Sequence, residues 1–180
     1  MTVSRRQFIM AAPPAFLAGG CNGPGLGNVL PDTVLPALPG LTDAGGWPVP
    51  GFASDEFRRG VALLTVWASW CPYCFAEHGH LLRLAADRRV RLLGLVVRDD
   101  PRKAVAFLRR EGNPFRAVAA DDGRLSGLLR APGVPASYVI GADARLEAKI
   151  LAAIDDSVLR ARVRPALDRA LARQATGATG

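Results

Sequence analysis

Two cysteines, Cys71 and Cys74, are separated by two residues in the segment WASWCPYC, and such a pair can do three kinds of chemistry. It can ligate a metal, close a structural disulfide, or alternate between dithiol and disulfide while passing electrons. A zinc site needs four ligands, and the only histidines nearby, His78 and His80, face different ways on a helix. A disulfide over so short a loop removes little entropy from the unfolded chain. Electron transfer is the leading interpretation, and no metal is expected.

The elements expected around the pair favour this chemistry. The apolar run Val61–Trp67 is typical of a strand buried on both faces, and Pro72 fits the first turn of a helix that reaches about Asp87. Cys71 should lie at the positive end of that helix, where the thiolate is stabilised and the thiol pKa falls. Cys74 should lie one turn further in, on the same face and more buried, where it can resolve a mixed disulfide formed at Cys71.

Two further residues are candidates for the same site. Glu77 follows Cys74 by three residues, so its carboxylate shares that helix face and can relay a proton if burial raises its pKa. The alternative for Glu77 is an exposed helical carboxylate without a catalytic role. Pro135 ends a Gly-Val-Pro run directly before an expected strand, which suggests a cis peptide beside the cysteine loop. An ordinary trans turn is the alternative there.

The remaining pattern indicates a mixed α/β order. A second buried strand is expected over Val90–Val97, and Asp100 should cap a helix that has Pro101 at its first position and Gly112 just past its end. The next expected elements are a strand over 115–119, a helix over 121–130, a hairpin of strands over 137–140 and 145–150, and a closing helix from about residue 156, kinked at Pro165. The predicted class is α/β, with a central mixed β-sheet flanked by helices.

The chain divides into four expected regions. Residues 1–21 contain adjacent arginines and an apolar run shorter than the ~20 residues that span a bilayer, which is typical of an export signal. Residues 22–46 are rich in Gly and Pro and are expected to form a flexible tether up to about Pro31, followed by an edge segment. Residues 47–174 should form the domain, and residues 175–180 a frayed C-terminus.

The first region also suggests a route and a modification. Residues 4–8, SRRQF, resemble the twin-arginine export signal, and the general secretory route is the alternative. Small residues before Cys21 resemble the lipobox of bacterial lipoproteins, in which the cysteine is acylated, although Ala18 replaces the usual large aliphatic residue. Plain cleavage and an uncleaved anchor are the alternatives. Lipidation would explain the odd third cysteine of an exported protein.

The charge of the chain carries less information. The net charge of +7 arises from 23 Lys and Arg against 16 Asp and Glu among 180 residues. It can favour an acidic partner or an anionic membrane, or it can be the average of an arginine-rich surface. Because no basic run is interleaved with aromatic residues, nucleic acid is not an expected partner.

The segment VWASWCPYCFAEH, the Gly-Val-Pro run and the element order together resemble the thioredoxin fold. More narrowly, residues 47–173 resemble the membrane-tethered periplasmic thiol-disulfide oxidoreductases of the TlpA/ResA/CcmG (DsbE) type. Those proteins carry W-x-x-W-C-x-x-C and a glutamate at the position of Glu77. The CcmG branch shares the runs AEH at 76–78, VRDD at 97–100 and GNPF at 112–115, together with Pro165.

The resemblance implies roles for these residues. Cys71 would be the nucleophile and Cys74 the resolving cysteine, with Glu77 as the acidic residue near the thiols. Pro135 would be the cis-proline against the sulfurs, and Val134 would offer its backbone to an extended substrate. The residues that flank the cysteines are further candidates for contact with substrate: Trp70, Pro72 and Tyr73.

The implied activity is reduction in the periplasm, at the inner membrane, with no cofactor beyond the Cys71–Cys74 disulfide. Electrons would come from a membrane thiol reductant. They would pass to oxidised C-x-x-C-H in apocytochrome c, directly or through a partner thiol protein, so that haem can be attached.

Three features depart from the family pattern. A twin-arginine start replaces the usual transmembrane anchor, Ala136 stands where CcmG proteins often have Glu, and the Pro-Tyr pair between the cysteines is familiar from glutaredoxins. Glutaredoxins, however, are shorter cytosolic proteins with a lysine just before the motif. Two other functions stay open, namely a TlpA-like reductase with another client, such as a copper-site protein or a peroxidase, and a thiol metallochaperone that uses Cys71, Cys74 and His78.

Overall fold

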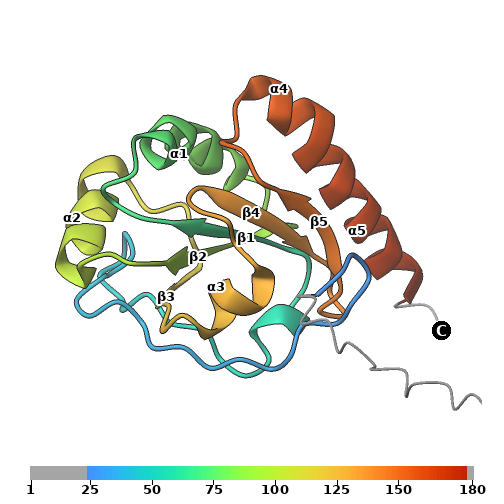
Figure 1. The fold of residues 1–180 in the computed structure, drawn as a ribbon, viewed down its shortest axis with the longest axis horizontal. Coiled ribbons are helices and arrows are strands. Elements are labelled where there is room, and N and C mark those ends of the chain that lie inside the picture. Colours follow the sequence, from blue (N-terminus) through green and yellow to red (C-terminus); the bar gives the residue numbers. More distant parts are fainter. Residues whose placement is uncertain (1–23, 178–180) are drawn as a thin grey trace, which may run out of the picture.

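The structure, a computed structural model, describes residues 24–177, so the predicted export signal and Cys21 lie outside the described residues. Its centre is a five-stranded sheet in the order β3-β2-β1-β4-β5 (Figure 1). Strands β1, β2 and β3 pair in parallel, while β4 pairs antiparallel with both β1 and β5, which confirms the predicted mixed sheet and hairpin. The strands are β1 Ala62–Trp67, β2 Arg91–Val96, β3 Ala117–Ala120, β4 Ala136–Ile140 and β5 Leu146–Ile150.

Helices cover both faces of the sheet (Figure 1). The helices are α1 Pro72–Leu84, α2 Pro101–Glu111, α3 Arg124–Leu129, α4 Asp156–Val158 and α5 Arg164–Gly177, with a short 3-10 helix at Glu56–Arg58. One core lies between the sheet and α1, α2 and α5, and a second lies between the sheet, α3 and the N-terminal segment. Alternate side chains of β1 enter the two cores, so β1 is buried on both faces as predicted.

The structure confirms the predicted start and end of α2. The Asp100 carboxylate accepts a hydrogen bond from Arg102 N–H at 2.8 Å, Pro101 occupies the first helical position, and Gly112 ends the helix with a φ of 91°. The helix expected over 121–130 is shorter than predicted, because Gly123 has a left-handed φ of 92° that no α-helix continues through, so α3 begins at Arg124.

A kink was expected at Pro165, and the structure has a π-helical turn directly before this proline. A π-helical turn occupies Leu159–Val163, and Arg164 N–H donates to Leu159 O directly before the proline, which has no N–H to give. Beyond this turn, α5 continues to Gly177, past the expected end of the domain at residue 174.

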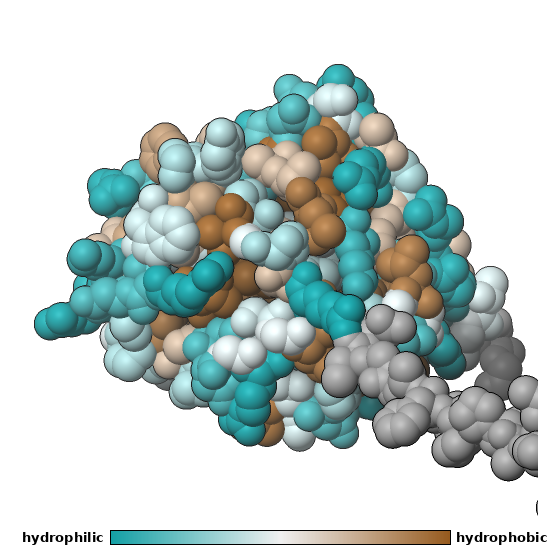
Figure 2. Space-filling model, viewed as in Figure 1, coloured by the Kyte–Doolittle hydropathy of each residue, from teal (hydrophilic) through white to brown (hydrophobic). Residues whose placement is uncertain are grey.

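Figure 2 shows one face of the molecule, on which hydrophobic patches are small and separated by hydrophilic residues. Among the described residues, no helix combines the length and the apolar character that a membrane crossing requires.

The prediction of a flexible tether is wrong for residues 24–31. Leu30 is fully buried, Gly27 N–H donates to Leu146 O at 2.7 Å, and Leu30 N–H donates to Ala144 O at 2.9 Å. The predicted edge segment pairs through isolated bridges, one of which joins Ala37 to Ala119 of β3. The Gly- and Pro-rich composition reflects an irregular path over the sheet, along which single leucines fill the core.

Leu30→Ala tests whether this segment belongs to the cooperative fold. Because Leu30 is fully buried, its truncation should lower the free energy of unfolding by about 2–5 kcal/mol, measured by urea denaturation. Leu26 is 64% exposed in the same segment, so Leu26→Ala should change stability by less than about 0.5 kcal/mol. Equal effects of the two variants would contradict the structure.

Candidate active site

The first cysteine lies where β1 gives way to α1. Cys71 is the N-cap residue of α1, and its Sγ accepts a hydrogen bond from Cys74 N–H at 3.3 Å. The Cys71 thiol also reaches Val134 O, at 3.5 Å. The sulfur therefore lies among the unpaired N–H groups of a helix start, as predicted.

The second cysteine is held as a thiol. Burial raises the pKa of Cys74, and its interaction with Cys71 acts in the same direction. Cys71 and Cys74 are each 3% exposed, so the expectation that Cys74 is the more buried of the two is wrong. The two free thiols therefore differ in position rather than in exposure. Cys71 is the N-cap residue of α1, whereas Cys74 lies within the helix.

Glu77 lies in the core behind this pair. It is 1% exposed, which overturns the alternative of an exposed helical carboxylate. One carboxylate oxygen accepts from Ile154 N–H at 2.9 Å, while Oε1 is buried without a partner among the described residues. Burial raises its pKa to about 7, against the opposing effect of the Ile154 hydrogen bond. Near neutral pH, Glu77 can therefore either accept or release a proton, and its charge is felt at Cys74.

The loop before β4 completes the site. The Val134–Pro135 peptide is cis, as predicted, and Val134 is the residue whose carbonyl meets the Cys71 thiol. Tertiary structure therefore brings together two segments that are more than sixty residues apart in the chain.

Exposed aromatic side chains lie next to the two cysteines in the chain. Trp70, Tyr73 and Phe75 are 57%, 67% and 55% exposed, and Pro72 between them is also exposed. Exposed aromatic residues of this size are typical of surfaces that meet a protein partner. Phe75 was missed from the sequence, although its position directly after Cys74 was a usable signal.

A second residue missed from the sequence is Asp99. Its carboxylate accepts from Ser69 N–H at 2.5 Å and from the Ser69 hydroxyl at 3.0 Å. The neighbouring Arg98 carbonyl accepts from the Trp70 indole N–H at 3.0 Å. Because β1 and β2 are parallel neighbours, the residues that follow them meet at one sheet edge, and this rule is a signal that could have found Asp99.

The two histidines have other partners. His78 Nε2 lies 2.9 Å from Gly112 O, its ring packs edge-on against Phe107, and burial lowers its pKa. His80 lies 3.2 Å from a carboxylate oxygen of Asp156. Residues 24–177 contain no group of three or more His, Cys, Asp and Glu side chains that could hold a metal ion.

The sequence matches the Redoxin family over residues 26–165. It is 33% identical, over 96% of this chain and 100% of the relative, to the thiol:disulfide interchange protein DsbE homolog of Paracoccus denitrificans. The chain belongs to the Redoxin family, as a DsbE-type thiol:disulfide oxidoreductase. This DsbE-type chain is also 32% identical to the DsbE protein of Haemophilus influenzae, over 66% of each chain.

Solved structures place the DsbE-type chain in the thioredoxin-like fold. A secreted Mycobacterium tuberculosis disulfide oxidoreductase, described as homologous to Escherichia coli DsbE, superposes with a TM-score of 0.60 at 25% identity, covering 74% of this chain and 96% of that one. A Chlorobium tepidum structure gives a TM-score of 0.63 at 20% identity, covering 82% and 99% of the two chains, and supports the fold alone.

Glu77→Gln should change how stability depends on pH. The folded pKa of about 7 lies above the usual 4.5, so the stabilisation is complete below about pH 4.5 and is lost as pH rises through about 7. Relative to Glu77→Gln, the free energy of unfolding of the reduced wild-type protein should fall by roughly 3 kcal/mol between about pH 4 and pH 8.

Urea denaturation of both proteins across this range measures the difference. Parallel profiles for wild type and Glu77→Gln would show that Glu77 does not change its protonation on folding.

Proposed function

We propose that this chain is a periplasmic thiol:disulfide reductase in which Cys71 attacks a client disulfide and Cys74 resolves the mixed disulfide. The observation that carries the proposal is the position of Cys71 Sγ, between the start of α1 and Val134 O. The start of α1 places this sulfur for attack on a disulfide, and an extended client is proposed to pass along the carbonyl. No cofactor beyond the Cys71–Cys74 disulfide is needed.

The reaction follows from this arrangement. The Cys71 thiolate attacks one client sulfur, forms a mixed disulfide and releases the other client sulfur as a thiolate. Cys74 then gives its proton to Glu77 and attacks Cys71 Sγ, which releases the second client thiolate and closes the Cys71–Cys74 disulfide. Two electrons pass to the client, and a membrane thiol reductant is proposed to return them.

The proposed client is oxidised C-x-x-C-H in apocytochrome c, or a partner thiol protein in haem attachment. The runs shared with the CcmG branch and the DsbE-type relatives support this choice. Trp70, Pro72, Tyr73 and Val134 are proposed to contact the client, since the first three are exposed around Cys71 and the fourth offers its carbonyl.

A second candidate function is a TlpA-like reductase with another client, such as a copper-site protein or a peroxidase. The observation that favours it is Ala136, which is fully buried at the start of β4 where CcmG proteins often carry a glutamate. The third candidate, a metallochaperone, is weakened because His78 is already engaged by Gly112.

Location is part of the proposal. Export is proposed to use the twin-arginine-like start, and Cys21 is proposed to carry the lipid that holds the domain at the inner membrane. Because Gly27 is already bonded to β5, at most about 20 Å of chain separates Cys21 from the folded domain. A lipid at Cys21 would therefore hold the domain within a short distance of the inner membrane.

Cys74→Ser should trap the client. Without the resolving thiol, the mixed disulfide at Cys71 persists, and mass spectrometry of adducts from the periplasm identifies the partner. Capture of a C-x-x-C-H protein or a maturation thiol protein is the expected result, and Cys71→Ser is the matched control that should capture nothing. A different client would support the second candidate, whereas no adduct at all would argue against the reductase.

Cys21→Ala should release the protein from the membrane. If Cys21 is the lipidated residue, cell fractionation should move the variant from the membrane to the soluble periplasmic fraction. Membrane association that survives the substitution would assign the anchoring to another feature.

A further inference from the structure

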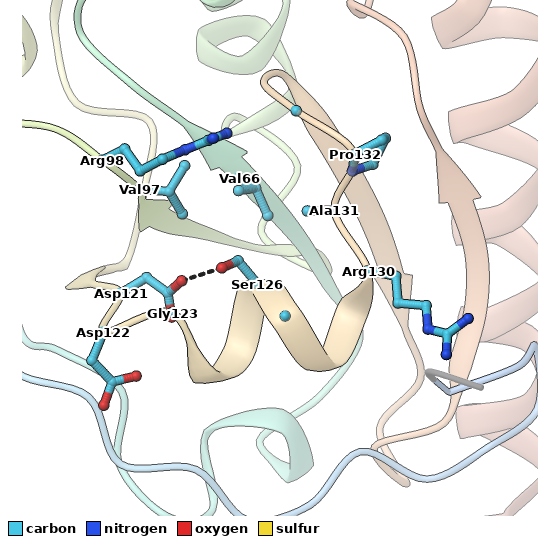
Figure 3. A pocket seen from close by; sticks show the side chains of 12 residues that line it. Val66, Val97, Arg98, Asp121, Asp122, Gly123, Ser126, Arg130, Ala131 and Pro132 are labelled. Carbon is cyan, nitrogen blue, oxygen red and sulfur yellow. Dashed lines mark hydrogen bonds between the residues drawn. The ribbon is translucent and has the colours of Figure 1, made fainter. Parts of the chain in front are cut away.

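A groove lies beside the active site, on the side of the loop that precedes β4. Its volume is about 590 Å³, and Val66 and Val97 contribute apolar side chains to its lining (Figure 3). Gly133 borders the groove and directly precedes Val134, whose carbonyl meets the Cys71 thiol. A client segment that runs past Val134 therefore reaches this groove next.

Two acids in the groove are already satisfied. Asp121 accepts from Leu125 N–H and, as drawn in Figure 3, from the Ser126 hydroxyl. The Asp122 carboxylate accepts a hydrogen bond from Arg124 Nε at 2.6 Å. The charge of Asp122 is thus balanced by Arg124, whereas Asp121 accepts only from neutral donors and keeps its negative charge.

Two arginines that line the groove have no partner for their guanidinium groups within residues 24–177. Arg98 and Arg130 are exposed, and within residues 24–177 neither guanidinium forms a hydrogen bond or an ion pair. In Figure 3, Arg98 extends across the groove toward Val66, whereas Arg130 points away from it. The unpaired cation that reaches over the groove is therefore the guanidinium of Arg98.

The backbone of Arg98 adopts an unusual conformation. Arg98 has a φ of 48°, in the left-handed region that a residue with a side chain rarely adopts. In this conformation its carbonyl accepts the Trp70 indole N–H beside Cys71. Arg98 thus connects Trp70 with the groove. Its backbone carbonyl holds the Trp70 indole, while its side chain lines the groove.

We infer that this groove receives the client segment next to the reacting disulfide, and that Arg98 selects clients with an acidic side chain in that segment. This inference rests on the proposed reductase function. The apolar lining accepts the aliphatic part of the client chain, and the guanidinium meets its carboxylate in a charge-assisted hydrogen bond. The electron transfer itself is the one described above and needs no further reactant.

Peptide disulfides test the selection. The probes are three peptides, each closed by one C-x-x-C disulfide and followed by two residues that are acidic, neutral or basic. The reduced full-length protein should reduce the acidic peptide with a kcat/KM about five- to tenfold above that of the neutral one, and the basic peptide more slowly than either. This preference should shrink at about 1 M salt, where the Debye length falls to ~3 Å.

Variants assign the preference to one side chain. Arg98→Glu should reverse the order of the acidic and basic peptides, and Arg98→Lys should keep part of the preference. Arg160→Glu is the matched control, because it makes the same change in net charge at an exposed arginine of the π-helical turn, outside the groove. It should leave the order unchanged.

The outcomes separate this inference from the proposed function. The rate with the neutral peptide also checks that each variant is folded. If the wild-type protein fails to reduce even the neutral peptide, the reductase proposal itself is wrong. If it reduces all three peptides alike, or if Arg98→Glu keeps the wild-type order, the reductase stands and the role of Arg98 is overturned.

Discussion

The pairing of β1 between β2 and β4 is the constraint on which the active site depends. Val66 is in register with Ala136 of β4, and Trp67 with Val96 of β2. The chain that leaves β1 toward Cys71 must therefore pass between the residues that follow β2 and those that precede β4. Backbone hydrogen bonds fix this register, so the sulfur is placed by the sheet rather than by flexible side chains.

The chemistry depends on keeping ionisable groups away from water. Cys74 and Glu77 are both buried, and burial raises the pKa of each because the charged form loses its hydration. Glu77 retains one hydrogen bond, from Ile154, and one carboxylate oxygen without a partner among the described residues. A carboxyl in this state weakens the fold when ionised, which is the cost of a buried carboxyl whose charge acts on Cys74.

The surface around Cys71 has two sides of different character. On one side, Trp70, Tyr73 and Phe75 expose aromatic rings next to the helix start. On the other, Val134 and the groove under Arg98 offer a carbonyl, an apolar lining and a positive charge. If Cys71 is the attacking cysteine, as proposed, a partner must bring a sulfur to it, and this asymmetric surface would distinguish clients by their flanking residues.

The sequence by itself determined the place of the cysteine pair at a strand–helix junction, the mixed α/β class and the limits of α2, because each depends on neighbours in the chain. Proline at a first helical turn, Asp100 as a cap and Gly112 as a stop are local signals. Only the tertiary structure decided that Glu77 is buried, that Asp99 holds Ser69, and that residues 24–31 belong to the fold. These outcomes depend on contacts between distant segments, from Ile154 to Glu77 and from Leu30 to Ala144, which no local pattern encodes. The groove under Arg98 arises in the same way, since it exists only where the ends of two strands, α3 and the loop before β4 converge.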